Sequence, residues 1–153
     1  MILRKTITIA LLVFVIAACN TEKAKEYNID LNDGTTVVYN SKDEAAITIN
    51  DWTEFNQINN TLNNLEEVDY VVPMERLESL NSAIINLANS VPSSLKTEEV
   101  LEDIADIQEE FTKLINEKYE PLDNVKQNIE ELVEKFYDLR EELNEIVEAY
   151  IAK

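Results

Sequence analysis

The sequence predicts an all-α domain, an antiparallel bundle of about four helices with heptad seams, preceded by a short extended or β-hairpin segment. Apolar side chains recur at three- and four-residue spacing from Trp52 to Tyr150, which is the periodicity of amphipathic helices. The three prolines of the chain, at positions 73, 92 and 121, divide this region into shorter segments. Upstream of it, a β-prone stretch contains the single glycine.

Residues 27–49 have the pattern of a β-hairpin or an extended arm. Apolar and polar residues alternate from Tyr27 to Leu31, as they do in a half-buried strand. An Asn-Asp-Gly turn signal follows and ends at Gly34, and a second β-prone run reaches Tyr39. We therefore expect two strands with Gly34 at the bend. An isolated hairpin is marginally stable in water, so it must pack on the helices or remain an extended arm.

The first helix is predicted from residue 51 onward. Asn50 is a suitable N-cap, and Asp51 suits the first turn, where the helix dipole favours a carboxylate. The two aromatic residues of this segment lie on its apolar stripe, so we expect them to anchor the core rather than to line a ligand pocket. The stripe consists of Trp52, Phe55, Ile58, Leu62 and Leu65.

A second apolar stripe predicts a helix between Pro73 and Pro92. Proline is tolerated at the first position of a helix, and the residue before a proline disfavours helical conformation, so the two prolines mark the ends. The connection over residues 66–72 is either a loop or a kinked continuation of the first helix. The stripe consists of Leu77, Leu80, Ile84, Leu87 and Val91.

The last two predicted helices flank Pro121. Thr97 is the expected N-cap of the third helix, with Glu98 and Glu99 in its first turn. The heptad phase breaks at Pro121, which favours a turn between antiparallel helices, while one kinked helix remains the alternative. The third stripe is Val100, Ile104, Ile107, Phe111 and Leu114, and the fourth is Val125, Ile129, Leu132, Phe136, Leu139, Leu143, Ile146 and Tyr150.

The composition excludes several kinds of chemistry. The 153 residues include 13 Lys+Arg and 31 Asp+Glu, a formal net charge of −18, with no histidine and one cysteine. Without histidine there is no Ser-His-Asp triad and no imidazole metal ligand, and a lone cysteine forms no intramolecular disulfide. The acidity argues against nucleic-acid binding, which depends on Lys and Arg. We therefore expect no catalytic residue, cofactor, metal site or nucleic-acid partner.

The first nineteen residues have the organisation of an export signal. Two basic residues near the N-terminus are followed by thirteen uncharged residues that end at Ala18. This run is shorter than the roughly 20 apolar residues of a membrane-spanning helix. It closes with the sequence Ile-Ala-Ala-Cys, which ends at Cys19. The segment resembles the signal peptide and lipobox of bacterial lipoproteins, in which an aliphatic and two small residues precede a cysteine.

The resemblance implies cleavage before Cys19, a thioether-linked diacylglycerol on Cys19 and acylation of the new amine. Two or more acyl chains anchor a protein stably to a membrane. Because Asn20 rather than aspartate follows the cysteine, the resemblance favours the outer membrane if the host is diderm. The expected organisation is a signal peptide (1–18), a lipidated cysteine with a polar tether (19–26), an extended or hairpin arm (27–49) and a helical domain (50–153).

Carboxylates are the abundant reactive groups of the mature chain. Those of the last two helices mostly avoid seam positions, so we interpret them as a solvated face; a weak divalent-cation surface or a docking face for a basic protein partner is the alternative. The leading hypothesis is a lipid-anchored, acidic, non-enzymatic interaction or structural module of the bacterial cell envelope. The runner-up is a ligand- or cation-binding accessory lipoprotein of a transporter or sensor system. The acids of the last two helices that we interpret as a solvated face are Glu102, Asp106, Glu109, Glu110, Glu130, Glu131, Glu134, Asp138, Glu141, Glu142, Glu145 and Glu148.

Overall fold

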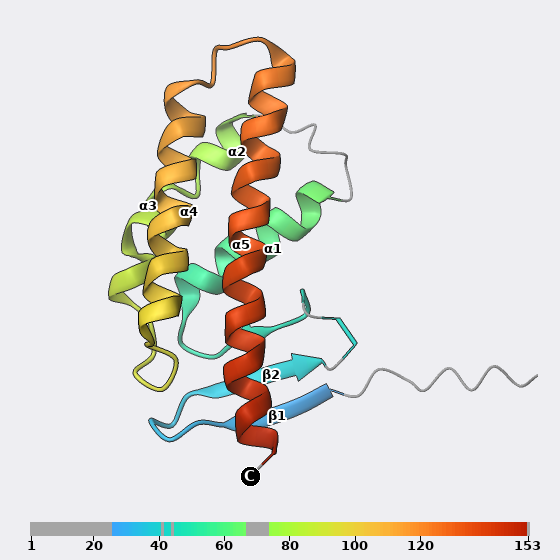
Figure 1. Ribbon diagram of the computed structural model, residues 1–153, viewed down its shortest axis with the longest axis vertical. Helices are drawn as coiled ribbons and strands as arrows, with labels where there is room; N and C mark the ends of the chain where they lie inside the picture. Colours follow the sequence, from blue (N-terminus) through green and yellow to red (C-terminus); the bar gives the residue numbers. More distant parts are fainter. Residues whose placement is uncertain (1–25, 41, 44, 67–73, 153) are drawn as a thin grey trace, which may run out of the picture.

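The computed structural model describes residues 26–40, 42–43, 45–66 and 74–152 (Figure 1). The predicted signal peptide, Cys19 with the tether up to residue 25, the connection over residues 67–72, and Pro73 lie outside the described residues. The described part is mostly helical and begins with an antiparallel sheet, as predicted. Among these residues, no helix has both the length and the apolar character that crossing a membrane requires.

The predicted hairpin is present and belongs to a three-stranded sheet. Strands β1 (Glu26–Asp30) and β2 (Thr36–Asn40) pair antiparallel, and a third strand that we did not predict, β3 (Thr48–Ile49), pairs with β2. Gly34 has a φ of 89° at the bend, a conformation that side chains with a Cβ rarely adopt. The expected turn at Gly34 is therefore confirmed.

Asp33 in this turn fastens the hairpin to the loop that precedes α4 (Glu98–Asn116). Its carboxylate accepts hydrogen bonds from the backbone N–H of Ser94 at 2.8 Å, the hydroxyl of Ser93 at 3.0 Å and the N–H of Thr35 at 3.0 Å. Partial desolvation alone would raise the pKa of Asp33, but the hydrogen bonds outweigh it and hold the pKa well below its usual range. The turn is thus tied to a loop about sixty residues further along the chain.

Helix α1 (Thr53–Glu66) forms where the first stripe predicts it, but its start differs from the prediction. Asp51 has a φ of 67°, in the left-handed region, so the chain turns there and cannot yet be helical. The predicted N-cap at Asn50 is therefore wrong. Instead, the Asn56 side chain accepts a hydrogen bond from the N–H of Ile49 and donates one to its carbonyl, which joins α1 to β3.

The second stripe does not form one continuous helix. It is divided into α2 (Met74–Glu78), α3 (Asn81–Asn86) and the 3₁₀ turn η1 (Leu87–Asn89), although all five apolar residues of the stripe are buried. The break occurs where the Ser79 hydroxyl donates to the carbonyl of Arg76, a local bond that competes with helix hydrogen bonding. The periodicity therefore predicted burial correctly but overstated the continuity of the backbone.

Helices α4 and α5 (Leu122–Ile151) are antiparallel neighbours on either side of Pro121 (Figure 1). The predicted N-cap is confirmed, because the Thr97 hydroxyl accepts a hydrogen bond from the N–H of Val100 at 3.1 Å. Pro121 directly precedes α5, where its missing N–H is harmless. Of the two alternatives at Pro121, the structure has the turn between two helices.

Helix α5 buries a wider face than a heptad seam. The predicted seam is buried from Val125 to Leu143, but Ile146 and Tyr150 near its end are only partly buried. A neighbouring row is buried as well, and it includes Val133 and Val147. This extra width lets one helix contact α4 on one side and the sheet on the other.

Aromatic stacking connects α1 to the middle of α5. The ring of Phe55 stacks on Trp52 at 5.0 Å and on Phe136 at 5.4 Å between centroids. The indole N–H of Trp52 donates to the Ser90 hydroxyl at 3.1 Å, so its polar end is also satisfied. The expectation that Trp52 and Phe55 anchor the core is confirmed.

Replacing Leu132 tests this core. The side chain is fully buried, so Leu132→Ala should lower the free energy of unfolding by about 2–5 kcal/mol through lost burial and a residual cavity. Urea denaturation followed by circular dichroism measures the change. Glu134→Ala, on the exposed side of the same helix, is the control and should change little. Equal denaturation midpoints for the two variants would contradict the assigned core.

Candidate functional site

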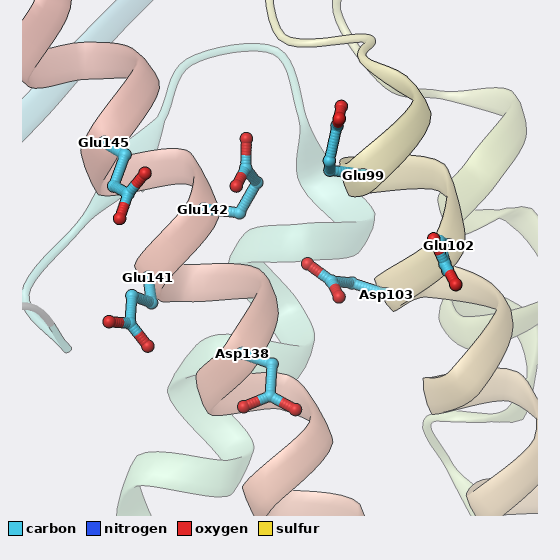
Figure 2. A pocket seen from close by; sticks show the side chains of 7 residues that line it. All are labelled: Glu99, Glu102, Asp103, Asp138, Glu141, Glu142 and Glu145. Carbon is cyan, nitrogen blue, oxygen red and sulfur yellow. The ribbon is translucent and has the colours of Figure 1, made fainter.

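The candidate site is a groove between α4 and α5 that is lined by carboxylates. It has a volume of about 310 Å³, and both helices contribute to it at spacings of three and four residues (Figure 2). Such spacings place side chains on one helix face, directly beside the apolar seam. We call it the acidic groove; its lining residues are Glu99, Glu102 and Asp103 on α4 and Asp138, Glu141, Glu142 and Glu145 on α5.

The side chains of Asp103 and Glu142 extend toward the space between the two helices (Figure 2). Partial burial raises the pKa of Asp103, and the nearby charges of Asp138 and Asp106 raise it further, while Lys135 opposes the shift. Partial burial likewise raises the pKa of Glu142, with contributions from Glu145 and Glu99. Both shifts mean that the folded protein holds these charges at an energetic cost at neutral pH.

Lysines neutralise the acids of α4 and α5 closer to Pro121. Lys135 Nζ lies 3.3 Å from a carboxylate oxygen of Asp106 and 3.4 Å from one of Asp138. Lys113 pairs with Glu110 on its own helix and with Glu131 on α5. No lysine or arginine is among the described residues that line the acidic groove. Asp138 belongs both to this charge-paired part and to the lining of the acidic groove. The other six lining carboxylates have no lysine or arginine beside them in the lining.

The predicted acids thus have different environments, and they are not all a simple solvated face. Five of them meet in the acidic groove: Glu102, Asp138, Glu141, Glu142 and Glu145. Glu148 lies nearer the sheet, where it accepts a 2.6 Å hydrogen bond from the Tyr39 hydroxyl. The sequence reasoning did not single out Glu99 and Asp103 as site residues. Their i,i+4 spacing beside the α4 stripe was visible, but the register between α4 and α5 was needed to bring them opposite the acids of α5.

The arrangement suits an extended positive ligand better than a single metal ion. Within the described ranges, no group of three or more His, Cys, Asp or Glu residues is placed to hold a metal ion. Calcium needs six to eight oxygens around one point, whereas the carboxylates here are spread along two helix faces. Cys19, the predicted lipid-attachment residue, lies outside the described residues.

No relative identifies this site. Comparison with protein-family models, with curated proteins and with solved structures finds no match to the chain. Its interpretation therefore rests on the geometry and charge of the groove.

Removing two of these charges should stabilise the protein at neutral pH. A raised carboxyl pKa in the folded state means that the ionised group opposes folding, so Asp103→Asn with Glu142→Gln removes a penalty. We expect a gain of up to about 1 kcal/mol at pH 7 after allowance for solvent screening. Thermal melts across pH measure it. Below about pH 4 the wild-type groups are themselves protonated, so the gain should vanish.

The control for this prediction is Glu109→Gln, which removes a charge from an exposed position of α4 outside the groove. Its effect at neutral pH should be smaller than that of either groove substitution. Destabilisation by the double substitution at pH 7 would show that the carboxylates have a supporting role instead.

Proposed function

We propose that the mature protein is a lipid-anchored, non-enzymatic interaction module of the bacterial cell envelope, and that its acidic groove binds a basic segment of a protein partner. The observation that carries this proposal is the meeting of seven carboxylates from two helices in one groove. Lys135 pairs with Asp138 at one end of the groove, and no described lysine or arginine is among the lining residues. Partial burial is the main reason why the pKa values of Asp103 and Glu142 are raised, and neighbouring carboxylates raise them further. An approaching row of Lys or Arg side chains would relieve the second contribution, the repulsion between the carboxylates.

The helical part is best interpreted as an antiparallel bundle built on α4 and α5. In this interpretation α1 packs through the Trp52–Phe55–Phe136 stack, and α3 and η1 pack against α4. The bundle would hold the groove on rigid helices, which is the precise kind of platform that charge recognition requires.

The lipid anchor would set the position of the domain relative to the membrane. Strand β1 begins at Glu26, seven residues after Cys19, so an extended tether would reach at most about 25 Å. The sheet end of the molecule would therefore stay close to the bilayer. By the lipobox resemblance, the outer membrane is the favoured location in a diderm host.

The second candidate is a ligand- or cation-binding accessory lipoprotein of a transporter or sensor system. For that role a small organic polycation fits better than a single metal ion. The carboxylates that line the 310 Å³ groove are spread along two helices and do not converge on one point. The two candidates share the groove and differ in the size of the ligand.

Replacing the lipobox cysteine tests the anchor. Cys19→Ala in the full-length protein should abolish incorporation of labelled fatty acid and release the protein from the membrane fraction, because no acyl chain remains. Thr21→Ala, which changes the tether and keeps the cysteine, is the control and should stay membrane-bound. Normal labelling and membrane retention of Cys19→Ala would refute lipidation at this residue.

A decalysine peptide probes the groove. Its affinity for the mature protein should fall as salt rises, and Glu102→Gln with Glu141→Gln should weaken binding. Each exposed charge pair contributes about 0.2–1 kcal/mol, so two lost pairs correspond to roughly 2- to 30-fold. Calorimetric titration measures the affinity.

The matched control removes two exposed charges from the same helices outside the groove, with Glu109→Gln and Glu134→Gln. If both double variants weaken binding equally, net charge rather than the groove attracts the peptide, and the groove proposal fails.

A further inference from the structure

The turn between α4 and α5 exposes two large apolar side chains that are three positions apart in the sequence. Tyr119 is 90% exposed and Leu122 is 75% exposed, and Pro121 between them is exposed as well. We call these three residues the tip patch. The turn lies at the opposite end of α5 from β1 (Figure 1). The acidic groove includes none of these residues, so the tip patch is a separate surface.

The backbone beneath the tip patch is firmly held. The N–H of Glu120 donates to the carbonyl of Glu117 at 2.9 Å, and the N–H of Val125 donates to the carbonyl of Pro121 at 3.2 Å. The Glu117 carboxylate accepts a 2.7 Å hydrogen bond from the Asn128 side chain, which joins the end of α4 to the start of α5. A partner would therefore meet side chains on an already ordered turn, which reduces the entropic cost of binding.

Core packing does not account for apolar residues at these two positions. The Nζ of Lys118 lies 5.1 Å from the centre of the Tyr119 ring, and the ring stays 90% exposed beside it. The α4 stripe ends at the buried Leu114, and the α5 stripe begins at the buried Val125. Tyr119 and Leu122 fall between them and cover little of the core. Tyrosine is enriched among the interface residues that contribute most of the binding energy, and a neighbouring leucine adds apolar area to such a contact.

Charges around the tip patch define the chemistry of the partner. Glu117, Glu120 and Asp123 lie next to its residues in the sequence, while the Nζ of Lys118 pairs with Glu78 at 2.6 Å. Two copies joined through this patch would bring like charges together, and entry into a bilayer would require these carboxylates to lose their hydration. A protein with an apolar pocket and a basic rim satisfies both the apolar and the acidic groups.

We propose that the tip patch is a docking site for a protein partner, in which Tyr119 and Leu122 enter an apolar pocket whose Lys or Arg rim faces Glu120 and its neighbouring acids. This surface goes beyond the proposed role of the acidic groove and does not depend on it. The groove offers charge alone, whereas the tip patch offers the apolar contact that lowers a dissociation rate.

Site-specific photocrosslinking in intact cells tests the proposal. The full-length protein carries benzoylphenylalanine in place of Tyr119, or in place of the 44% exposed Tyr137 of α5 as the matched control. We expect one discrete protein adduct from position 119 and not from position 137. Leu122→Ser and, separately, Glu120→Lys should each lower its yield at least fivefold. Thermal melts of both variants should match wild type, because both side chains are exposed.

Four outcomes would overturn the proposal. An adduct with a second copy of the chain would assign the patch to self-association, and an adduct with phospholipid would assign it to the membrane. An adduct whose yield is unchanged by Glu120→Lys would show that the partner has no basic rim facing Glu120. The absence of any adduct at position 119, with the folded protein present, would leave the patch without a partner and reject the docking role.

Discussion

The structure depends on the burial of one wide face of α5. This thirty-residue helix contacts α4, the sheet near its C-terminal end and α1 through Phe136. Apolar burial stabilises by about 25 cal/mol per Å², so the many fully buried side chains of this face contribute strongly to the stability of the core. Even Arg140 lies in this face, with its guanidinium near the rings of Phe136 and Tyr137 and bonded to the Asn63 side chain.

The same constraint determines where the charges go. Because the seams of α4 and α5 are apolar, the acids of both helices are displaced to the borders of the interface. Lysine at positions 113 and 135 neutralises one part of that border. Beyond it, toward Glu99 and Glu145, no lysine occupies an equivalent position in the lining, and the acidic groove results. The candidate site is therefore a consequence of how a few lysines are distributed over two acidic helices.

Periodicity predicted the helices and most buried side chains, because core burial follows helix geometry directly. It did not predict three local features of the backbone. These are the left-handed conformation of Asp51, the break between α2 and α3 near the Ser79 hydrogen bond, and the two-residue strand β3. The burial of Val133 and Val147 was not predicted. A heptad seam describes packing against one neighbouring helix, whereas α5 packs against α4 and the sheet. The candidate site required the register of α4 against α5, which the sequence of either helix alone does not contain.

The attachment of the hairpin has a consequence for the order of assembly as the chain is synthesised. Asn32 bonds to Tyr150, 118 residues away, and Tyr39 bonds to Glu148, 109 residues away. The hairpin, which comes first in the described part of the chain, thus completes its contacts only when the last helix has formed. Two-stranded hairpins are marginal by themselves, and contacts of such high sequence separation form slowly. During synthesis the N-terminal strands therefore lack these contacts until the C-terminal helix has formed.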